Sequence, residues 1–303
     1  MLERALREDA VDGDVTTSTL LGGSGPPPSV SVSFVARGAG VVCGLPVLAA
    51  LYGHAAPEVA YRALLEDGDR VAPGQTILEL EGPAPRLLAL ERTALNFLGR
   101  LGGIASWTAR WVELVAGTGA GLYDTRKTTP GWRYLEKYAV RTGGGNNHRM
   151  HLGDGALVKD NHVALLRALG RWDPVACVAS FRRAAPGTFV ELEVDGREEF
   201  LAALAASPDA ILLDNFTPED ARWAVSRRAE PGSARPLLEA SGGITFETVR
   251  VMAETGVDRI SVGALTHSAP VLDIGLDIGL DTSAPRGSPG LGSGPPRRAG
   301  RLA

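Results

Sequence analysis

The sequence predicts an α/β protein: an incomplete (β/α) TIM-like barrel that follows an N-terminal α+β sandwich domain. Short, almost wholly apolar segments alternate with amphipathic segments of helical period from residue 106 onward, which is typical of a parallel sheet covered by helices. Before residue 86, short strands prevail and helices are few. The apolar segments of the second part end in polar residues or glycines, as one active-site rim requires.

The first 85 residues predict a small domain of short strands. A short helix opens the chain, and Asp14 or Thr16 is placed to cap a turn in the run that follows. Residues 22–30 are rich in Gly and Pro and break regular structure. Two strands joined at Gly38 come next. The remaining elements expected here are a helix at 45–53, a strand and turn at 59–71, and a turn and strand at 72–82.

Helical periodicity replaces the strand pattern between residues 86 and 115. The pair Gly102–Gly103 interrupts it, so we expect two helices joined by a kink. The expected division of the chain is an N-terminal domain with its linking helices at 1–105, a barrel with the active site at 106–272, a C-terminal segment at 273–281 and a disordered tail at 282–303, which is rich in Ser, Gly, Pro and Arg.

The second part alternates strand and helix in about six units, which favours a barrel over an open sheet. No GxGxxG opens a helix after its first strand, which weighs against a dinucleotide fold. The expected strands lie at 120–125, 143–150 leading to 156–161, 188–194, 210–215, 236–243 and 259–265. The expected helices lie at 162–172, 197–207, 218–229 and 245–256.

Composition excludes several classes of protein. The chain of 303 residues is 44% hydrophobic and carries a formal charge of −4, so it can bury a core and lacks the basic face of a nucleic-acid binder. It has no apolar run of the roughly 18 residues that span a membrane, and its N-terminus is no signal peptide. Cys43 and Cys177 are too far apart to indicate a disulfide framework or a zinc site. We expect a soluble cytoplasmic protein.

One stretch, residues 123–162, concentrates positive charge in this acidic chain and includes all three lysines, Lys127, Lys137 and Lys159. A local cationic cluster of this kind favours a small, highly charged anion. Three of its segments flank apolar strands and predict a pocket that presents Arg126, Lys127, Arg149 and Lys159. His148 and His162 are candidates for hydrogen bonding or proton transfer. The members assigned to an exposed helical face are Arg133, Lys137 and Arg141.

Glycine-rich turns follow the last two predicted strands, at 241–244 and 261–267. Such turns expose backbone N–H groups and favour phosphate, although each alone is equally explained as a tight turn. Glu193 and Asp214 stand within or at the end of apolar strands and must be paired or metal-bound. They suit a magnesium ion, a developing positive charge on a sugar, or ion pairs with the cationic cluster. Glu191 and Asp195 share the strand face of Glu193, so parity does not choose among the three acids.

Long blocks of this sequence resemble one known family. The blocks are DTRKTTPGWRYLEKYAV, GGGNNHRMHLGDGALVKDNH, VELEVD, ILLDNF, LEASGGIT and GVDRISVGALTHS, with ERTALNFLGRLGGIAS and EDAVDGDVTTSTL in the N-terminal part. Together they resemble quinolinate phosphoribosyltransferase, also called nicotinate-nucleotide pyrophosphorylase (carboxylating), from about Glu8 to Ile278. The resemblance implies a dimeric enzyme that joins quinolinate to phosphoribosyl pyrophosphate, with magnesium, and forms nicotinate mononucleotide, pyrophosphate and CO2.

The resemblance also implies a role for each matching residue. The quinolinate carboxylates would be held by Arg126, Arg149 and Lys159, with Lys127 and His148 beside them. Arg92 would reach across the dimer into the neighbouring site. Glu193 and Asp214 would serve the ribose and magnesium end, the metal held directly or through water, and Lys127, Lys159, Glu193 and Asp214 would be the catalytic set. The 5′-phosphate would be lined by Ser241, Gly242, Gly243, Gly263 and His267.

Three other functions compete with this interpretation. A phosphoribosyltransferase-like paralogue of a metal-transport cluster would share the fold, but the chain keeps both the RKT and NNHR motifs. A non-catalytic phosphate- or nucleotide-binding regulator would be expected to lose Lys159, Glu193 or Asp214, and all three are present. A phosphate-binding barrel lyase or isomerase would need no Arg/Lys cluster of dicarboxylate size.

Overall fold

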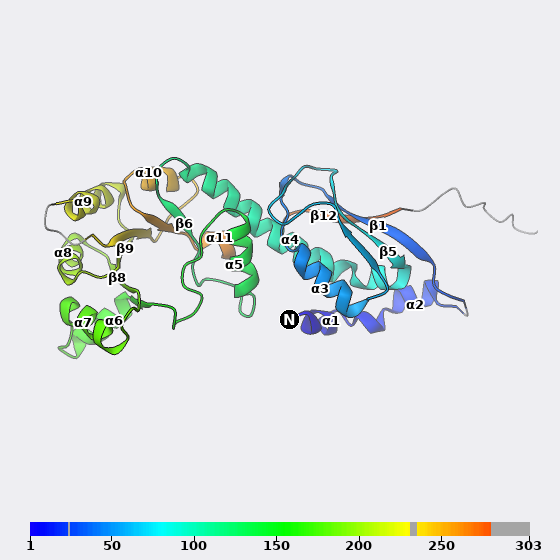
Figure 1. Ribbon diagram of the computed structural model, residues 1–303, viewed down its shortest axis with the longest axis horizontal. Coiled ribbons are helices and arrows are strands. Elements are labelled where there is room, and N and C mark those ends of the chain that lie inside the picture. The colour runs from blue at the N-terminus through cyan, green and yellow to red at the C-terminus, as the bar shows by residue number, and fades with distance from the viewer. Residues whose placement is uncertain (24, 231–234, 280–303) are drawn as a thin grey trace, which may run out of the picture.

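The structure, a computed structural model, describes residues 1–23, 25–230 and 235–279. Two units lie at opposite ends of its long axis, and one long helix runs from one to the other (Figure 1). The tail predicted at 282–303 lies outside the described residues. Among the helices that are described, none combines the length and the hydropathy needed to cross a membrane.

The N-terminal unit is built on an antiparallel sheet in the order β12-β1-β5-β3. Asp14 caps helix α2, accepting a hydrogen bond from the Thr17 N–H at 2.9 Å, so Asp14 is the capping residue of the two proposed. The sheet strands are β1 (Ser29–Ala36), β3 (Ala60–Ala63), β5 (Thr76–Pro83) and β12 (Ile274–Gly279), and a separate ladder pairs β2 (Gly40–Val41) with β4 (Arg70–Val71). The helices of this unit are α1 (Leu2–Glu8), η1 (Val11–Gly13), α2 (Val15–Leu21) and α3 (Leu45–Ala55).

Helix α4 (Ala84–Val115), 32 residues long, belongs to both units. Leu87 to Leu98 pack into the core of the N-terminal sheet, whereas Leu101 to Val115 pack into the barrel core. A single helix that contributes to two cores fixes one unit relative to the other. The predicted boundary between residues 105 and 106 falls inside this helix, and the bounds 1–105 and 106–272 remain proposals.

The expected kink at Gly102–Gly103 is wrong, because both glycines are helical and buried. They make room for the segment that returns from the barrel to the N-terminal sheet. A Cβ on Gly103 would lie 2.0 Å from the Pro270 carbonyl oxygen, and one on Gly102 would lie 2.9 Å from Leu272 Cδ2. Beyond this crossing, β12 joins the N-terminal sheet beside β1. The glycines therefore serve close packing rather than a change of helix direction.

The second unit is a six-stranded parallel sheet in the order β6-β11-β10-β9-β8-β7. In the part of the chain that the structure describes, β6 and β7 are the two edges, so the barrel stays open between them. This agrees with the predicted incomplete (β/α) barrel. The strands are β6 (Gly121–Tyr123), β7 (Ala156–Val158), β8 (Val190–Val194), β9 (Ala210–Asp214), β10 (Leu237–Ser241) and β11 (Arg259–Ser261).

Helices α6 to α10 lie outside these strands (Figure 1). They are α6 (Asp160–Ala168), α7 (Pro174–Ala184), α8 (Arg197–Ala206), α9 (Pro218–Arg228) and α10 (Val249–Ala253), with α5 (Arg133–Thr142) after β6 and the short α11 (Ala264–His267) after β11. Helix α7 was missed by the sequence analysis. Its signal is Asp173 before Pro174, because the Asp173 side chain caps the helix by accepting from the Val175 and Ala176 N–H groups.

Candidate active site

The carboxyl ends of the parallel strands form one rim, and the predicted barrel residues meet there. Asp214 ends β9 and Ser241 ends β10. Lys159 directly follows β7 and is the N-cap residue of α6. Other predicted residues lie in the turns, loops or short helix that follow strands of this rim: Gly242 and Gly243 after β10, Arg126 and Lys127 after β6, and Gly263 and His267 after β11.

The turn after β10 requires glycine. Gly242 and Gly243 have φ values of +80° and +59°, which favour glycine. A Cβ on Gly242 would lie 2.3 Å from Asn215 Oδ1 and 2.7 Å from Asp214 Oδ1. The turn thus packs its backbone directly against Asp214 and Asn215 at the end of β9, which leaves no room for a side chain at position 242.

The turn after β11 meets the cationic loop that follows β6. A Cβ on Gly263 would lie 2.9 Å from Lys127 Cδ and 3.0 Å from His267 Nε2, so these two side chains converge over the glycine. The Thr266 hydroxyl donates to the Lys127 carbonyl at 2.7 Å and holds the loop in place. Two cationic or hydrogen-bonding groups therefore face a bare backbone turn, which suits an anionic oxygen group.

The structure separates the three strand acids that parity left equivalent. Glu191 is buried inside the barrel beside His148, at 3.2 Å. Glu193 lies at the rim and forms an ion pair with Lys159. Asp195 is exposed, and a hydrogen bond with Glu199 raises the pKa of its carboxyl group. Glu193 is therefore the one of the three that faces the rim.

Glu193 and Asp214 form a donor set that fits a magnesium ion. Burial raises the pKa of Asp214, and the charge of Glu193 raises it further, so the two carboxylates repel each other across the rim. Lys159 occupies Oε2 of Glu193, whereas Oε1 makes only a long contact of 3.4 Å with the Asp160 N–H. A hard cation completed by water or substrate oxygens would relieve this repulsion.

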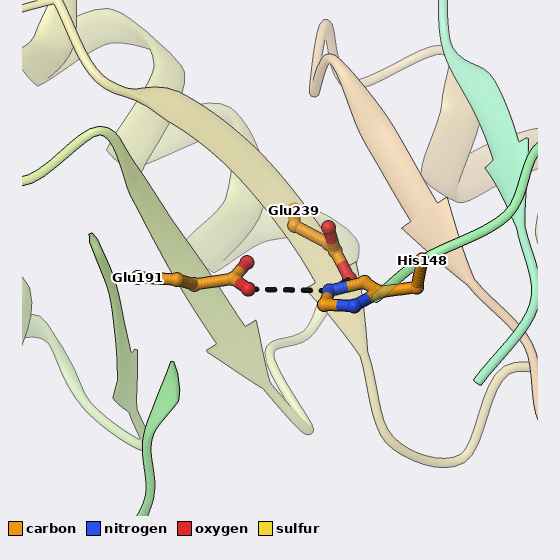
Figure 2. A group of neighbouring side chains, drawn as sticks. All are labelled: His148, Glu191 and Glu239. Carbon is orange, nitrogen blue, oxygen red and sulfur yellow. Dashed lines mark hydrogen bonds and ion pairs between the residues drawn. The ribbon is translucent and has the colours of Figure 1, made fainter. Parts of the chain in front are cut away.

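His148 joins two buried acids from different strands, as Figure 2 shows. Its Nε2 lies 3.2 Å from Glu191 Oε2 and 3.3 Å from Glu239 Oε1. The Glu239 side chain is fully buried, and among the described residues its carboxylate is paired with the His148 ring rather than with a backbone or hydroxyl donor. Arg259 Nη1, 3.9 Å away, is a further cation near it. Burial of this carboxylate is thus tolerated because positive groups surround it.

The protonation of His148 Nε2 determines whether this cluster forms hydrogen bonds or binds a metal ion. Burial alone would lower the pKa of His148, but the hydrogen bonds and charges of Glu191 and Glu239 outweigh it and raise the pKa to about 9. The Arg149 N–H donates to Nδ1 at 2.8 Å, which opposes that rise. In both charge states Nε2 carries a proton, so it donates to the carboxylates and is not a metal ligand. The cluster is therefore an ionic anchor for the ring.

Arg126 and Arg149 are close enough to repel each other. Burial lowers the pKa of Arg149, and the charge of Arg126 lowers it further. Arg149 Nη1 donates to the Gly155 carbonyl at 2.9 Å, whereas Arg126 Nε is buried without a hydrogen-bond partner among the described residues. Two partly buried guanidinium groups that repel each other and keep unused hydrogen-bond donors suit a carboxylate-bearing ligand.

The assignment of Lys137 to an exposed helical face is wrong. Lys137 is fully buried and forms an ion pair with the equally buried Asp124. Arg133 is half-buried, and its guanidinium donates to Thr128 Oγ1 and the Met150 carbonyl. Only Arg141 is exposed as expected.

The segment predicted as a strand at 143–150 forms only a single bridge, between Asn146 and Tyr123. It cannot extend into a strand because the polar groups of the following residues bind Asp124 and Lys137 instead.

Two predicted residues lie outside the cluster at the rim. Arg92 is exposed on α4, and in the described chain no hydrogen bond or ion pair joins it to the barrel. His162 acts as a helix cap, with Nδ1 accepting from the Lys159 N–H at 2.9 Å. The residues to which the sequence analysis gave no role are Glu239, Asp124 and the pair of the partly exposed Arg100 with the buried Glu136. Glu239 had a signal: it is an acid within an apolar strand, as Glu193 is.

The incomplete barrel, with cationic side chains and two glycine turns after its strands, defines a class of protein, a barrel enzyme suited to anionic substrates. Comparison with known proteins gives the family. Residues 14–102 match the N-terminal domain of quinolinate phosphoribosyl transferase, and residues 104–277 match its C-terminal domain. The chain therefore belongs to the quinolinate phosphoribosyl transferase family.

Known relatives cover almost the whole chain. A nicotinate-nucleotide pyrophosphorylase [carboxylating] from Mycobacterium leprae is 46% identical over 283 residues, which are 91% of this chain and 95% of the relative. A human protein of the same name is 36% identical over 94% of this chain and 93% of its own length. The crystal structure of nicotinate-nucleotide pyrophosphorylase from Ehrlichia chaffeensis superposes with a TM-score of 0.83 at 36% identity, covering 92% of this chain and 97% of that one.

Proposed function

We propose that the rim transfers the phosphoribosyl group of phosphoribosyl pyrophosphate to quinolinate and then releases CO2, giving nicotinate mononucleotide and pyrophosphate. The observation that carries this proposal is the Arg126–Lys127 loop, which adjoins both kinds of anion site: Arg126 lies near Arg149, and Lys127 lies over the turn at Gly263. The Arg126–Arg149 pair suits carboxylates, and the turns at Gly242 and Gly263 suit a phosphate. The reaction is that of NAD biosynthesis, and we place it in the cytoplasm.

The cationic pocket orients quinolinate. Arg126, Arg149 and Lys159 hold its two carboxylates, with Lys127 and His148 beside them. Because the two guanidinium groups repel each other in the free protein, a substrate with one carboxylate leaves part of that repulsion in place. The pocket therefore discriminates against nicotinate by leaving a buried cation without a partner.

The opposite side of the rim holds the phosphoribosyl donor. Ser241, Gly242, Gly243, Gly263 and His267 line the 5′-phosphate, with Lys127 over the second turn. Glu193 and Asp214 face the ribose and would hold magnesium, directly or through water. When bound, that ion neutralises charge on the pyrophosphate leaving group.

Each chemical step then draws on residues of this chain. Departure of pyrophosphate leaves positive charge on the sugar, which the carboxylates of Glu193 and Asp214 stabilise electrostatically. The ring nitrogen of quinolinate bonds to the anomeric carbon and becomes quaternary. CO2 then leaves the neighbouring ring carbon, whose electron pair is stabilised by that nitrogen, and a proton takes its place. Lys127 and Lys159, which follow the two edge strands β6 and β7, keep the ring and sugar in line.

We also propose that the enzyme acts as a homodimer in which Arg92 enters the neighbouring site. Its exposure on α4 and the lack of a barrel contact within the described residues support a role across an interface.

A CO2-release assay with quinolinate, phosphoribosyl pyrophosphate and magnesium tests the reaction, with nicotinate as the control substrate. We expect CO2 and nicotinate mononucleotide from quinolinate alone. Arg149→Ala should cripple the use of quinolinate and leave the KM for phosphoribosyl pyrophosphate nearly unchanged. Arg62→Ala, on strand β3, where the side chain is 75% exposed, is the control variant and should match the wild type. A folded, dimeric protein that releases no CO2 would instead favour the metal-transport paralogue.

A further inference from the structure

A buried ion pair lies directly behind the cationic pocket. Asp124 directly follows β6 and stands two residues before Arg126, and Lys137 comes from the middle of α5. Both side chains are fully buried, with 0% exposure each. A fully buried pair is costly to desolvate, and apolar residues of similar size often replace such a pair without loss of stability. Stability alone is therefore a weak reason for its presence.

The Asp124–Lys137 pair binds both backbone polar groups of His148. The His148 N–H donates to Asp124 Oδ1 at 2.8 Å, and Lys137 Nζ donates to the His148 carbonyl at 2.9 Å. With its amide nitrogen turned toward them, Asn147 also donates to Asp124 Oδ2 at 2.8 Å and to the Lys137 carbonyl at 2.9 Å. The His148 backbone and the Asn147 side chain are thus held by the ion pair rather than by a neighbouring strand.

The same segment carries the recognition side chains outward. The His148 ring is held on the barrel side by Glu191 and Glu239. Arg149 follows directly, and its N–H donates to the ring at Nδ1. A small shift of the His148 backbone would therefore displace both the imidazole and the Arg149 guanidinium. Asp124 stands two residues before Arg126, so one pair links the two segments that supply the guanidinium groups.

We propose that Asp124 and Lys137 are positioning residues for substrate specificity: their buried ion pair clamps the His148 backbone and so sets the spacing of Arg126 and Arg149 for an aromatic 1,2-dicarboxylate. The inference rests on the proposed function, because it presumes that these two arginines bind quinolinate. Burial, which raises the pKa of Asp124 to about 6 and lowers that of Lys137, agrees with a pair held out of water. Neither residue touches the reacting atoms, so neither is catalytic.

The test compares Lys137→Met and the double variant Asp124→Asn/Lys137→Met with the wild type. Methionine removes the donor to His148 while keeping much of the side-chain volume, and the double variant leaves no unpaired buried charge, so it folds even if the single variant does not. The matched control is Arg228→Met/Asp258→Asn, which removes a partly buried pair at the opposite end of the strands. For each protein, the KM values of both substrates, the Kd of quinolinate by titration calorimetry and the Tm are measured.

We expect the KM and Kd of quinolinate to rise about tenfold or more in the Lys137 variants, with the KM of phosphoribosyl pyrophosphate within about twofold of wild type. The control pair should lower Tm without changing either KM. An unchanged quinolinate Kd in a folded Lys137 variant would overturn the proposal, and so would an equal loss for both substrates that the control pair reproduces. Arg149→Ala distinguishes failure of this inference from failure of the proposed function. If this variant binds quinolinate as the wild type does, the proposed quinolinate pocket itself is wrong.

Discussion

Arg100 Nη2 on α4 lies 2.6 Å from Glu136 Oε1 on α5, and this pair joins the interdomain helix to the active-site loop. Glu136 is fully buried and also accepts from the Thr129 N–H at 3.1 Å and the Thr129 hydroxyl at 2.9 Å. Arg100 donates in turn to the Thr266 carbonyl at 2.7 Å. The loop that carries Lys127 and the turn that carries His267 are therefore held by one ion pair.

Glu136→Gln should destabilise the protein by about 1–3 kcal/mol, because an amide replaces a buried charged acceptor. Arg100→Met should cost more, about 3–5 kcal/mol, because it leaves the Glu136 carboxylate buried without its cation. Denaturant unfolding followed by circular dichroism measures both changes. The control is Glu254→Gln, whose pair with Arg250 is about half exposed and should change stability by less than about 0.5 kcal/mol. Equal effects of the buried and exposed variants would contradict this account.

His148 should titrate well above the usual pKa of a histidine. Its two carboxylate neighbours raise the pKa to about 9, so the ring should be charged at neutral pH. Because the folded-state pKa of His148 exceeds the unfolded value near 6.5, the charged ring stabilises the folded protein. This stabilisation is complete below pH 6.5 and is lost as the pH rises through about 9. By linkage this contribution is at most about 3 kcal/mol.

Nitrogen-15 NMR of the histidine side chains measures this pKa directly. Glu191→Gln and Glu239→Gln should each lower it, because each removes one of the two charges that favour the imidazolium. A His148 ring that stays in the neutral Nε2–H form at pH 7 would mean that the Arg149 N–H outweighs both carboxylates.

The sequence predicted which residues lie at the rim but not the buried ion pair of Asp124 with Lys137 that supports it. Glu193 and Asp214 could be found because an acid at the end of an apolar strand has few structural explanations. Lys137 could not, because its helix reads as polar on several faces, and only the fold shows that Asp124 comes to meet it. Helical periodicity shows on which face of a helix a residue lies, but it does not show which distant segment packs against that face.

The glycine pair in α4 shows the same limit from the other side. Gly102–Gly103 interrupts a helical pattern and so predicted a kink. Nothing in the sequence indicates that residues 270–272 cross the helix at these glycines. The barrel strands were predicted more successfully because a parallel sheet buries each strand on both faces, which leaves a continuous apolar run in the sequence.

Two glycine-to-alanine substitutions should change stability in opposite directions. Gly103→Ala places a Cβ 2.0 Å from the Pro270 carbonyl oxygen, so the crossing segment must move, and we expect a loss of about 2–4 kcal/mol. Gly53→Ala, in helix α3, meets no atom within 4 Å and should stabilise the protein by about 0.5–1 kcal/mol through helix propensity. Thermal unfolding of both variants checks the pair. Stabilisation by both would mean that the crossing segment adapts without cost.

Mixing two inactive variants should restore activity if Arg92 acts across the dimer. In a hybrid of Arg92→Ala and Lys159→Ala subunits, a site that takes Arg92 from its neighbour carries either both defects or neither. One site in each hybrid dimer is then intact, and random exchange of subunits should recover about a quarter of wild-type activity. If Arg92 instead serves the site of its own chain, every site in the mixture keeps one defect and no activity returns. The assay is CO2 release after the two variants are unfolded and refolded together, with each variant refolded alone as the control. Because both outcomes start from the same two proteins, the result depends only on which chain supplies Arg92.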